Sequence, residues 1–192
     1  LLPALDIAGR TDLDMDLRAQ GATTRALAAT LTGTLGLALT DGRIGPRLAG
    51  GIVSGLPGAQ GGAIPLACLA VGAVADRGSV RFGTLYAEGG LGRAAGDGGL
   101  NLADESLALR FSTDLRVAGV RLRAPVPLTG TLLRPRLDWG GVAQGALAGD
   151  LGRQVERFVP GLGAALPQQA GPALPECGPA LAAARGGRAG PV

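Results

Sequence analysis

The sequence predicts a mainly β protein with a few short helices: a curved antiparallel β-meander with an apolar concave face and a C-terminal amphipathic helix. Apolar and charged residues alternate near the start of the chain, as in a half-buried strand. Short apolar segments separated by turn residues then recur from Ile64 to Trp139. The 35 glycines and 13 prolines suit a fold with many turns, and the scarcity of aromatic residues requires a core of Leu, Val and Ala.

The region from Thr11 to Ile44 contains two predicted strands and a short helix. In the first strand Leu13, Met15 and Leu17 fall on one face and the intervening aspartates on the other. A short helix follows over residues 21–29, with Thr23 or Thr24 as its N-cap. The second strand carries Leu35, Leu37 and Leu39 on one face, and Asp41-Gly42 is expected to close it with a tight turn. We expect the two strands to pair with their leucines on the same side.

The next segments alternate between turns and strands. Residues 45–62 are rich in glycine and are expected to form a mobile insert. Strands are expected at 66–74, 80–86, 91–102, 107–113, 120–123 and 126–137. On them, the alternation assigns Val80, Phe82, Thr84 and Tyr86 to one face of their strand, and Leu107, Leu109 and Phe111 to one face of theirs. Together with the first strands they define a sheet region over residues 1–140.

The pattern changes after residue 140. Apolar residues recur at spacings of three and four over residues 141–162, which predicts an amphipathic helix ending near Pro160. Residues 163–192 form a tail rich in proline, glycine and alanine, with a short terminal helix expected at 176–185.

Composition excludes several classes of active site. Without histidine or lysine the chain has no His-based triad, zinc-histidine site, Walker A loop or Schiff base. Asp12, Asp14 and Asp16 alternate along a strand at roughly 7 Å, too far apart to share one cation easily. The net charge of +3 is spread along the sequence, which argues against nucleic-acid binding. We therefore expect no enzyme activity, catalytic residue, metal or cofactor.

Several stretches, in order, resemble the C-terminal region of the AsmA family. Residues 11–44 read as an alternating Leu/Asp strand, a G-A-T helix and a G-T-L-x-L-x-L-x-D-G-x-I strand; residues 122–137 resemble the family's P-V-x-x-x-G-T-L-x-x-P stretch. Residues 64–68 and 76–80 are similar to its paired strands, in which a cysteine precedes a turn. The resemblance implies a periplasmic location, with inner-membrane anchorage by an upstream segment absent from this sequence.

The resemblance also implies a function. AsmA-like proteins are implicated in outer-membrane biogenesis and in moving phospholipid between the membranes of the Gram-negative envelope along a hydrophobic β-groove. Acyl chains would then slide along an apolar face while headgroups stay at its open edge. The sequence leaves open whether this face is a groove or ordinary core. Its candidate residues are Leu13, Met15, Leu17, Leu35, Leu37, Leu39, Val80, Phe82, Leu107, Leu109 and Phe111.

A second function remains open. The chain would then be an assembly or targeting factor that holds outer-membrane protein precursors by β-augmentation, without transporting lipid. Phospholipid would co-purify with a transporter, and peptide with an assembly factor.

The cysteines Cys68 and Cys177 are candidates for a disulfide, given the periplasmic location that the resemblance implies. Such a bond would tie the terminal helix to the sheet. The alternative is a pair of unrelated buried thiols.

Overall fold

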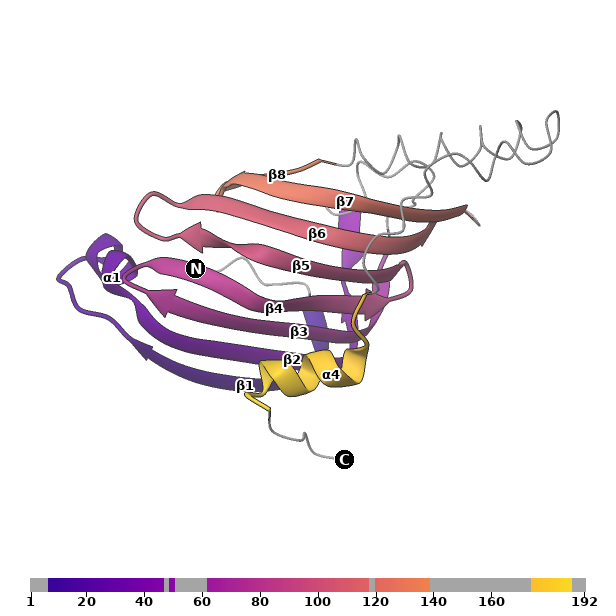
Figure 1. Cartoon of the computed structure of the whole chain (residues 1–192), viewed down its shortest axis with the longest axis horizontal. Helices are drawn as coiled ribbons and strands as arrows, with labels where there is room; N and C mark the ends of the chain where they lie inside the picture. The colour runs from indigo at the N-terminus through magenta and orange to yellow at the C-terminus, as the bar shows by residue number, and fades with distance from the viewer. Residues whose placement is uncertain (1–6, 47–48, 51–61, 118–119, 139–173, 188–192) are drawn as a thin grey trace.

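The computed structural model describes residues 7–46, 49–50, 62–117, 120–138 and 174–187 (Figure 1). Its strands form one sheet of eight in sequence order, every neighbouring pair antiparallel. This confirms the predicted antiparallel meander. The strands are β1 (Ile7–Arg18), β2 (Thr32–Ile44), β3 (Ile64–Asp76), β4 (Ser79–Gly89), β5 (Gly92–Asn101), β6 (Ser106–Val117), β7 (Val120–Thr131) and β8 (Arg134–Leu137), and the helices are α1 (Thr24–Thr30) and α4 (Cys177–Ala184).

The first two strands pair as predicted, with α1 between them. Leu13 pairs with Leu37 and Met15 with Leu35, so their side chains share a face. Thr23 is the N-cap of α1, and its hydroxyl accepts a hydrogen bond from the Ala26 amide at 3.2 Å.

The expected turn at Asp41-Gly42 was wrong. β2 runs on to Ile44, which pairs with Ile7 and Ile64. Asp41 has φ 51 and is skipped in the registers with both neighbours, so it is an irregularity within a strand. An Asp-Gly pair tolerates left-handed backbone in a bulge as well as in a turn, which is why local sequence did not separate the two.

A second irregularity changes which residues of β4 share a face. Thr84 pairs with Gly72, but Phe82 pairs with Ala73, so Gly83 is an extra residue. Each bulged residue shifts the alternation by one. Val80 and Phe82 therefore face one side while Thr84 and Tyr86 face the other, and the expectation that all of them share a face was wrong.

The third correction concerns residues 120–131, which form one strand, not two. Pro125 and Pro127 lie inside β7, opposite Ser112 and Arg110. The Pro127 carbonyl accepts from the Asp138 amide at 3.0 Å, so the backbone of this residue points away from β6. The nitrogen of Pro127 points to the same side, so its missing N–H removes no bond of the β6–β7 ladder. It removes none of the β7–β8 ladder either, because β8 pairs with residues 128–131.

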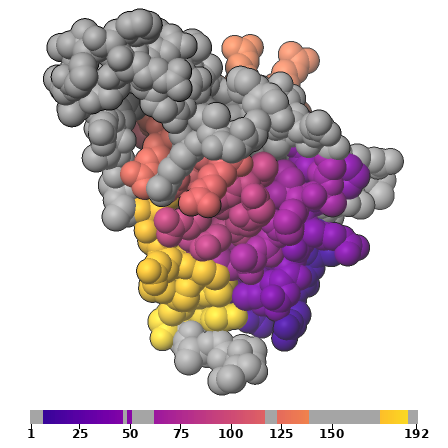
Figure 2. Space-filling model, turned by 90° about the vertical axis from the view of Figure 1, so that its right-hand side faces the viewer, coloured from indigo at the N-terminus to yellow at the C-terminus, as the bar shows by residue number. Residues whose placement is uncertain are grey.

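The sheet is curved, and its two faces differ. We call the face that carries Ala38, Ala70 and Tyr86 the outer face; α4 packs on it. The other face, which carries Leu37, Val71 and Leu85, we call the inner face. In Figures 1 and 2 the indigo-to-purple ends of β1, β2 and β3 lie on the side away from α4 (yellow). The sheet therefore bends away from α4, and its inner face is concave.

Helix α4 sits on small residues of the outer face. Its buried side chains Ala180, Leu181 and Ala184 form a cluster with Ala38, Cys68, Ala70 and Tyr86. Glycine at position 36 permits this contact, since a Cβ there would collide with the Ala184 carbonyl oxygen. The predicted terminal helix is therefore present.

The Cys68–Cys177 disulfide is confirmed, and it ties the start of α4 to β3. At the other end of the helix, the Arg185 guanidinium donates to Asp12 Oδ2 at 2.6 and 3.1 Å. The predicted helix at 141–162 and most of the insert at 45–62 lie outside the described residues.

Candidate functional site

The structure brings the candidate apolar residues together on the inner face. We call residues that pair with one another across neighbouring strands a row. One row contains Val80, Leu100 and Leu107, the next Phe82, Gly98 and Leu109, and a third Leu85, Gly96 and Phe111. At the other end of the sheet, Leu13, Leu37 and Val71 form a row, as do Met15, Leu35 and Ala73. These rows contain no charged side chain.

Exposure of the inner face rises toward the β1 edge. Leu13 and Met15 are 58% and 56% exposed. Leu17, Leu35, Leu37, Val80, Phe82, Leu109 and Phe111 are half-buried, and Leu39 and Leu107 are buried. Among the described strands β1 pairs with β2 alone. An apolar surface that continues to such an edge strand is unusual for a soluble monomer, because it offers both apolar area and backbone groups to a partner.

Sequence reasoning missed several residues of this face. Leu69 and Val71 lie on it beside Leu39 and Leu37, and Val126 and Leu128 lie beside Phe111 and Leu109. The β3 pattern is hard to read because Cys68 and Ala70, on the outer face, are apolar too. The pairing register is the signal that identifies them.

Gly96 in β5 makes room for an aromatic ring of the inner face. A Cβ at Gly96 would stand 2.6 Å from Cδ1 of Phe111. The Phe111 ring therefore lies over the backbone of β5. On this face the Thr113 side chain is buried, and its hydroxyl donates to the Ala124 carbonyl at 2.8 Å, which satisfies it without solvent.

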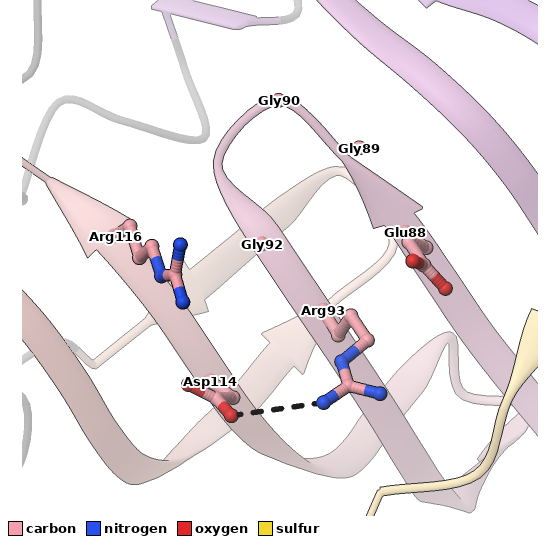
Figure 3. A pocket seen from close by; sticks show the side chains of 7 residues that line it. All are labelled: Glu88, Gly89, Gly90, Gly92, Arg93, Asp114 and Arg116. Atoms are coloured by element: carbon pink, nitrogen blue, oxygen red, sulfur yellow. Dashed lines mark ion pairs between the residues drawn. The ribbon is translucent and has the colours of Figure 1, made fainter.

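The outer face carries a polar hollow of about 270 Å³ near the β4–β5 turn (Figure 3). It is lined by Glu88, Gly89, Gly90, Gly92, Arg93, Asp114 and Arg116. Asp114 is almost buried and lies 3.9 Å from Arg93 and 3.3 Å from Arg123. Its carboxylate is therefore neutralised by neighbouring arginines, so the hollow is a mixed-charge site.

Tyr86 contacts both this hollow and α4: it is hydrogen-bonded to Glu88, and it belongs to the buried cluster that α4 packs against. It is 2% exposed, and its hydroxyl donates to Glu88 Oε2 at 2.6 Å. Burial, followed by the hydrogen bond to Glu88 and the charge of its carboxylate, raises the pKa of Tyr86 to about 12. The phenol is thus a neutral donor at physiological pH.

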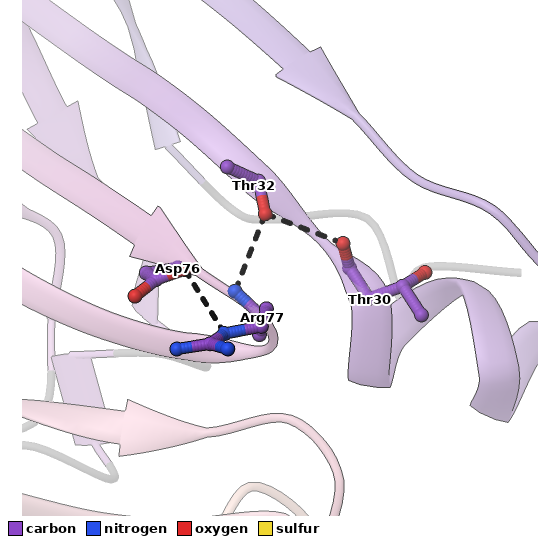
Figure 4. A network of polar contacts seen from close by, with 4 residues as sticks. All are labelled: Thr30, Thr32, Asp76 and Arg77. Carbon is purple, nitrogen blue, oxygen red and sulfur yellow. Dashed lines mark hydrogen bonds and ion pairs between the residues drawn. The ribbon is translucent and has the colours of Figure 1, made fainter.

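The polar contacts between α1 and the β3–β4 turn are structural (Figure 4). The Thr32 hydroxyl donates to the Thr30 carbonyl and accepts from the Arg77 amide at 3.3 Å. Arg77 has φ 46 and Gly78 φ 78, the left-handed pair of a tight hairpin turn. The Arg77–Asp76 ion pair is exposed and contributes little.

Over the described ranges, no group of three or more His, Cys, Asp or Glu residues is placed to hold a metal ion. No helix within those ranges is long and apolar enough to cross a membrane.

Comparisons with known proteins found no relative. No family model matches the sequence, and no curated protein or solved structure matches it either.

Proposed function

We propose that this chain is the C-terminal part of an AsmA-like envelope protein and that it carries phospholipid between membranes on its inner face. The observation that supports this is the alignment of the candidate residues across the sheet. They share one concave, uncharged face that extends to an exposed edge. Acyl chains bind such a surface without directional contacts, at roughly 0.8 kcal/mol for each buried methylene. Such transport requires no catalytic residue, metal or cofactor.

The location belongs to the same proposal. The disulfide supports an oxidising compartment such as the periplasm, since thiols are kept reduced in the cytosol. Anchorage in the inner membrane would come from an upstream segment, and the partners would be phospholipid acyl chains and the envelope membranes.

Native mass spectrometry with lipid extraction tests the transport proposal on protein expressed in the periplasm. Leu13→Asp and Val74→Asp form a matched pair, because both side chains are 58% exposed but Val74 lies on the outer face, opposite Arg81. We expect bound phospholipid in the wild type and in Val74→Asp, and its loss in Leu13→Asp, Leu37→Asp and Leu109→Asp. Circular dichroism would identify variants that do not fold.

Lipid-free wild-type protein would refute the transport proposal. If, in addition, Leu37→Asp and Leu109→Asp fail to fold, then the inner face is ordinary core.

The second candidate is an assembly or targeting factor for outer-membrane proteins, and the β1 edge favours it. This strand is 12 residues long and pairs only with β2 among the described strands. A precursor strand could add to it by β-augmentation. Peptide in place of lipid in the mass spectrum, with slower hydrogen exchange in β1, would favour this function.

A further inference from the structure

The outer face is rich in arginine over β5–β8, the part that α4 does not cover. Arg110 on β6 pairs with Asp97 and Pro127, and Arg123 on β7 pairs with Asp114, so these residues share that face. The arginines on it whose side chains the structure describes are Arg93, Arg110, Arg116, Arg123, Arg134 and Arg136, and all but Arg93 are exposed. The described acidic residues at outer positions of these strands are Asp97 and Asp114, and exposed Asp104 and Glu105 lie in the β5–β6 turn. Folding thus concentrates positive charge that is spread along the sequence.

A turn with exposed leucines lies at one end of this arginine surface. Leu132 and Leu133 connect β7 to β8 and are 44% and 82% exposed. Tight hairpin turns normally use glycine, asparagine or aspartate, so two leucines are not explained by turn geometry. The Leu132 amide donates to the Glu105 carbonyl at 3.0 Å, and the Arg134 amide donates to Thr131 Oγ1 at 3.2 Å. These bonds hold the leucines outside the sheet.

We propose that this surface docks the protein on an anionic phospholipid bilayer. The leucines of the turn would insert at the level of the headgroups, and the arginines would bind lipid phosphates. Guanidinium groups match phosphate oxygens in geometry as well as charge. Apolar side chains combined with neighbouring cations are the arrangement that binds peripheral proteins to membranes.

Membrane docking explains both features, whereas other anionic partners explain only one. Nucleic acid would use the arginines, but its phosphates have no contact for exposed leucines, and the chain has few aromatic residues for base stacking. An anionic bilayer offers phosphates at its surface and apolar chains just beneath. Docking does not depend on the transport function, because it uses the opposite face of the sheet.

Vesicle co-sedimentation tests the proposal with two liposome types: phosphatidylcholine alone, and equal parts of phosphatidylcholine and phosphatidylglycerol. We expect binding to the anionic vesicles that falls as salt rises. At about fivefold for each arginine, the combined Arg110→Gln, Arg116→Gln, Arg134→Gln and Arg136→Gln variant should bind about 600-fold more weakly. The matched control neutralises Arg18, Arg25, Arg43 and Arg77, which are exposed elsewhere. It should lose less than about tenfold.

The leucine turn is tested separately. Leu132→Ser combined with Leu133→Ser should weaken vesicle binding by about tenfold and leave its salt dependence unchanged, whereas Val74→Ser should have no effect. Absence of binding to anionic vesicles would overturn the proposal, as would equal losses in the arginine variant and its control. Tighter binding to a short DNA duplex than to vesicles would also overturn it. Lipid extracted from the arginine variant reports on transport independently, and we expect its amount to match wild type.

Discussion

The contact between α4 and β2 gives a direct test of the fold, because it requires a residue without a side chain at position 36. Gly36→Ala would place a methyl group against the Ala184 carbonyl oxygen, at the last residue of the helix. Either α4 or β2 must move. Overpacking of this kind costs about 1 to 3 kcal/mol, and partial loss of Leu181 burial adds a share of its roughly 1.5 to 3 kcal/mol. Because the disulfide still tethers Cys177, the helix should tilt without leaving the sheet.

The expected result is a loss of about 2 to 3 kcal/mol in the free energy of unfolding, measured by urea denaturation. Hydrogen exchange should also accelerate at the Arg185 amide, which donates to the Leu181 carbonyl at 3.0 Å. Gly83→Ala is the matched control, since a Cβ there meets nothing within 4 Å. If both variants unfold at the same urea concentration, α4 does not rest on β2 as described, and the reasoning is refuted.

Other features of the α4 region give further predictions. Replacing both Cys68 and Cys177 by alanine opens a loop with a sequence separation of 109 and should lower the free energy of unfolding by about 4 to 5 kcal/mol on the chain-entropy estimate, measured by urea denaturation; a loss below about 1 kcal/mol would contradict it. Tyr86, the chain's single tyrosine, should titrate by phenolate absorbance near its raised pKa of about 12. Since the folded state favours the protonated phenol, this stabilisation is complete below pH 10 and is lost as pH rises toward 12, by on the order of 2 kcal/mol relative to Tyr86→Phe; titration at pH 10 would contradict the burial. Asp12→Asn should cost at most about 1 kcal/mol, because the ion pair with Arg185 is partly exposed, yet should speed exchange in the last turn of α4; unchanged exchange would mean that the pair does not hold the helix.

The alternation of apolar residues predicted the strands well and their faces less well. Leu107, Leu109 and Phe111 follow a regular strand, so a period of two assigned them correctly. The same rule failed for Thr84 and Tyr86, because Gly83 inserts one residue and reverses the alternation. A glycine in a strand is a weak signal of a bulge in a chain with 35 glycines. Pairing with β3, which no local pattern reveals, decides the outcome.

The face of the sheet on which α4 packs could not be predicted from the sequence, for a different reason. The terminal helix and its disulfide partner were predicted, but the leucines of β2 were the obvious apolar surface for a helix to cover. The structure places α4 on the opposite face, over Gly36 and Ala38, where small side chains let a helix approach the strands closely. Apolar character alone did not distinguish the two faces of β2 and β3, because both faces are apolar. The faces differ in side-chain size, and α4 packs on the face with the smaller side chains.

This choice of face bears on function. A helix on the small-residue side is fixed by a covalent bond, a close backbone contact and an ion pair, so it is not available to cover the leucines of the inner face. Of the two helices α1 and α4, neither therefore covers those leucines. Leu107 and Leu39 are buried, but Leu13 and Met15 are exposed at the β1 edge. Any ligand or strand that occupies the inner face should therefore enter there, and Leu13→Asp should affect entry before it affects folding.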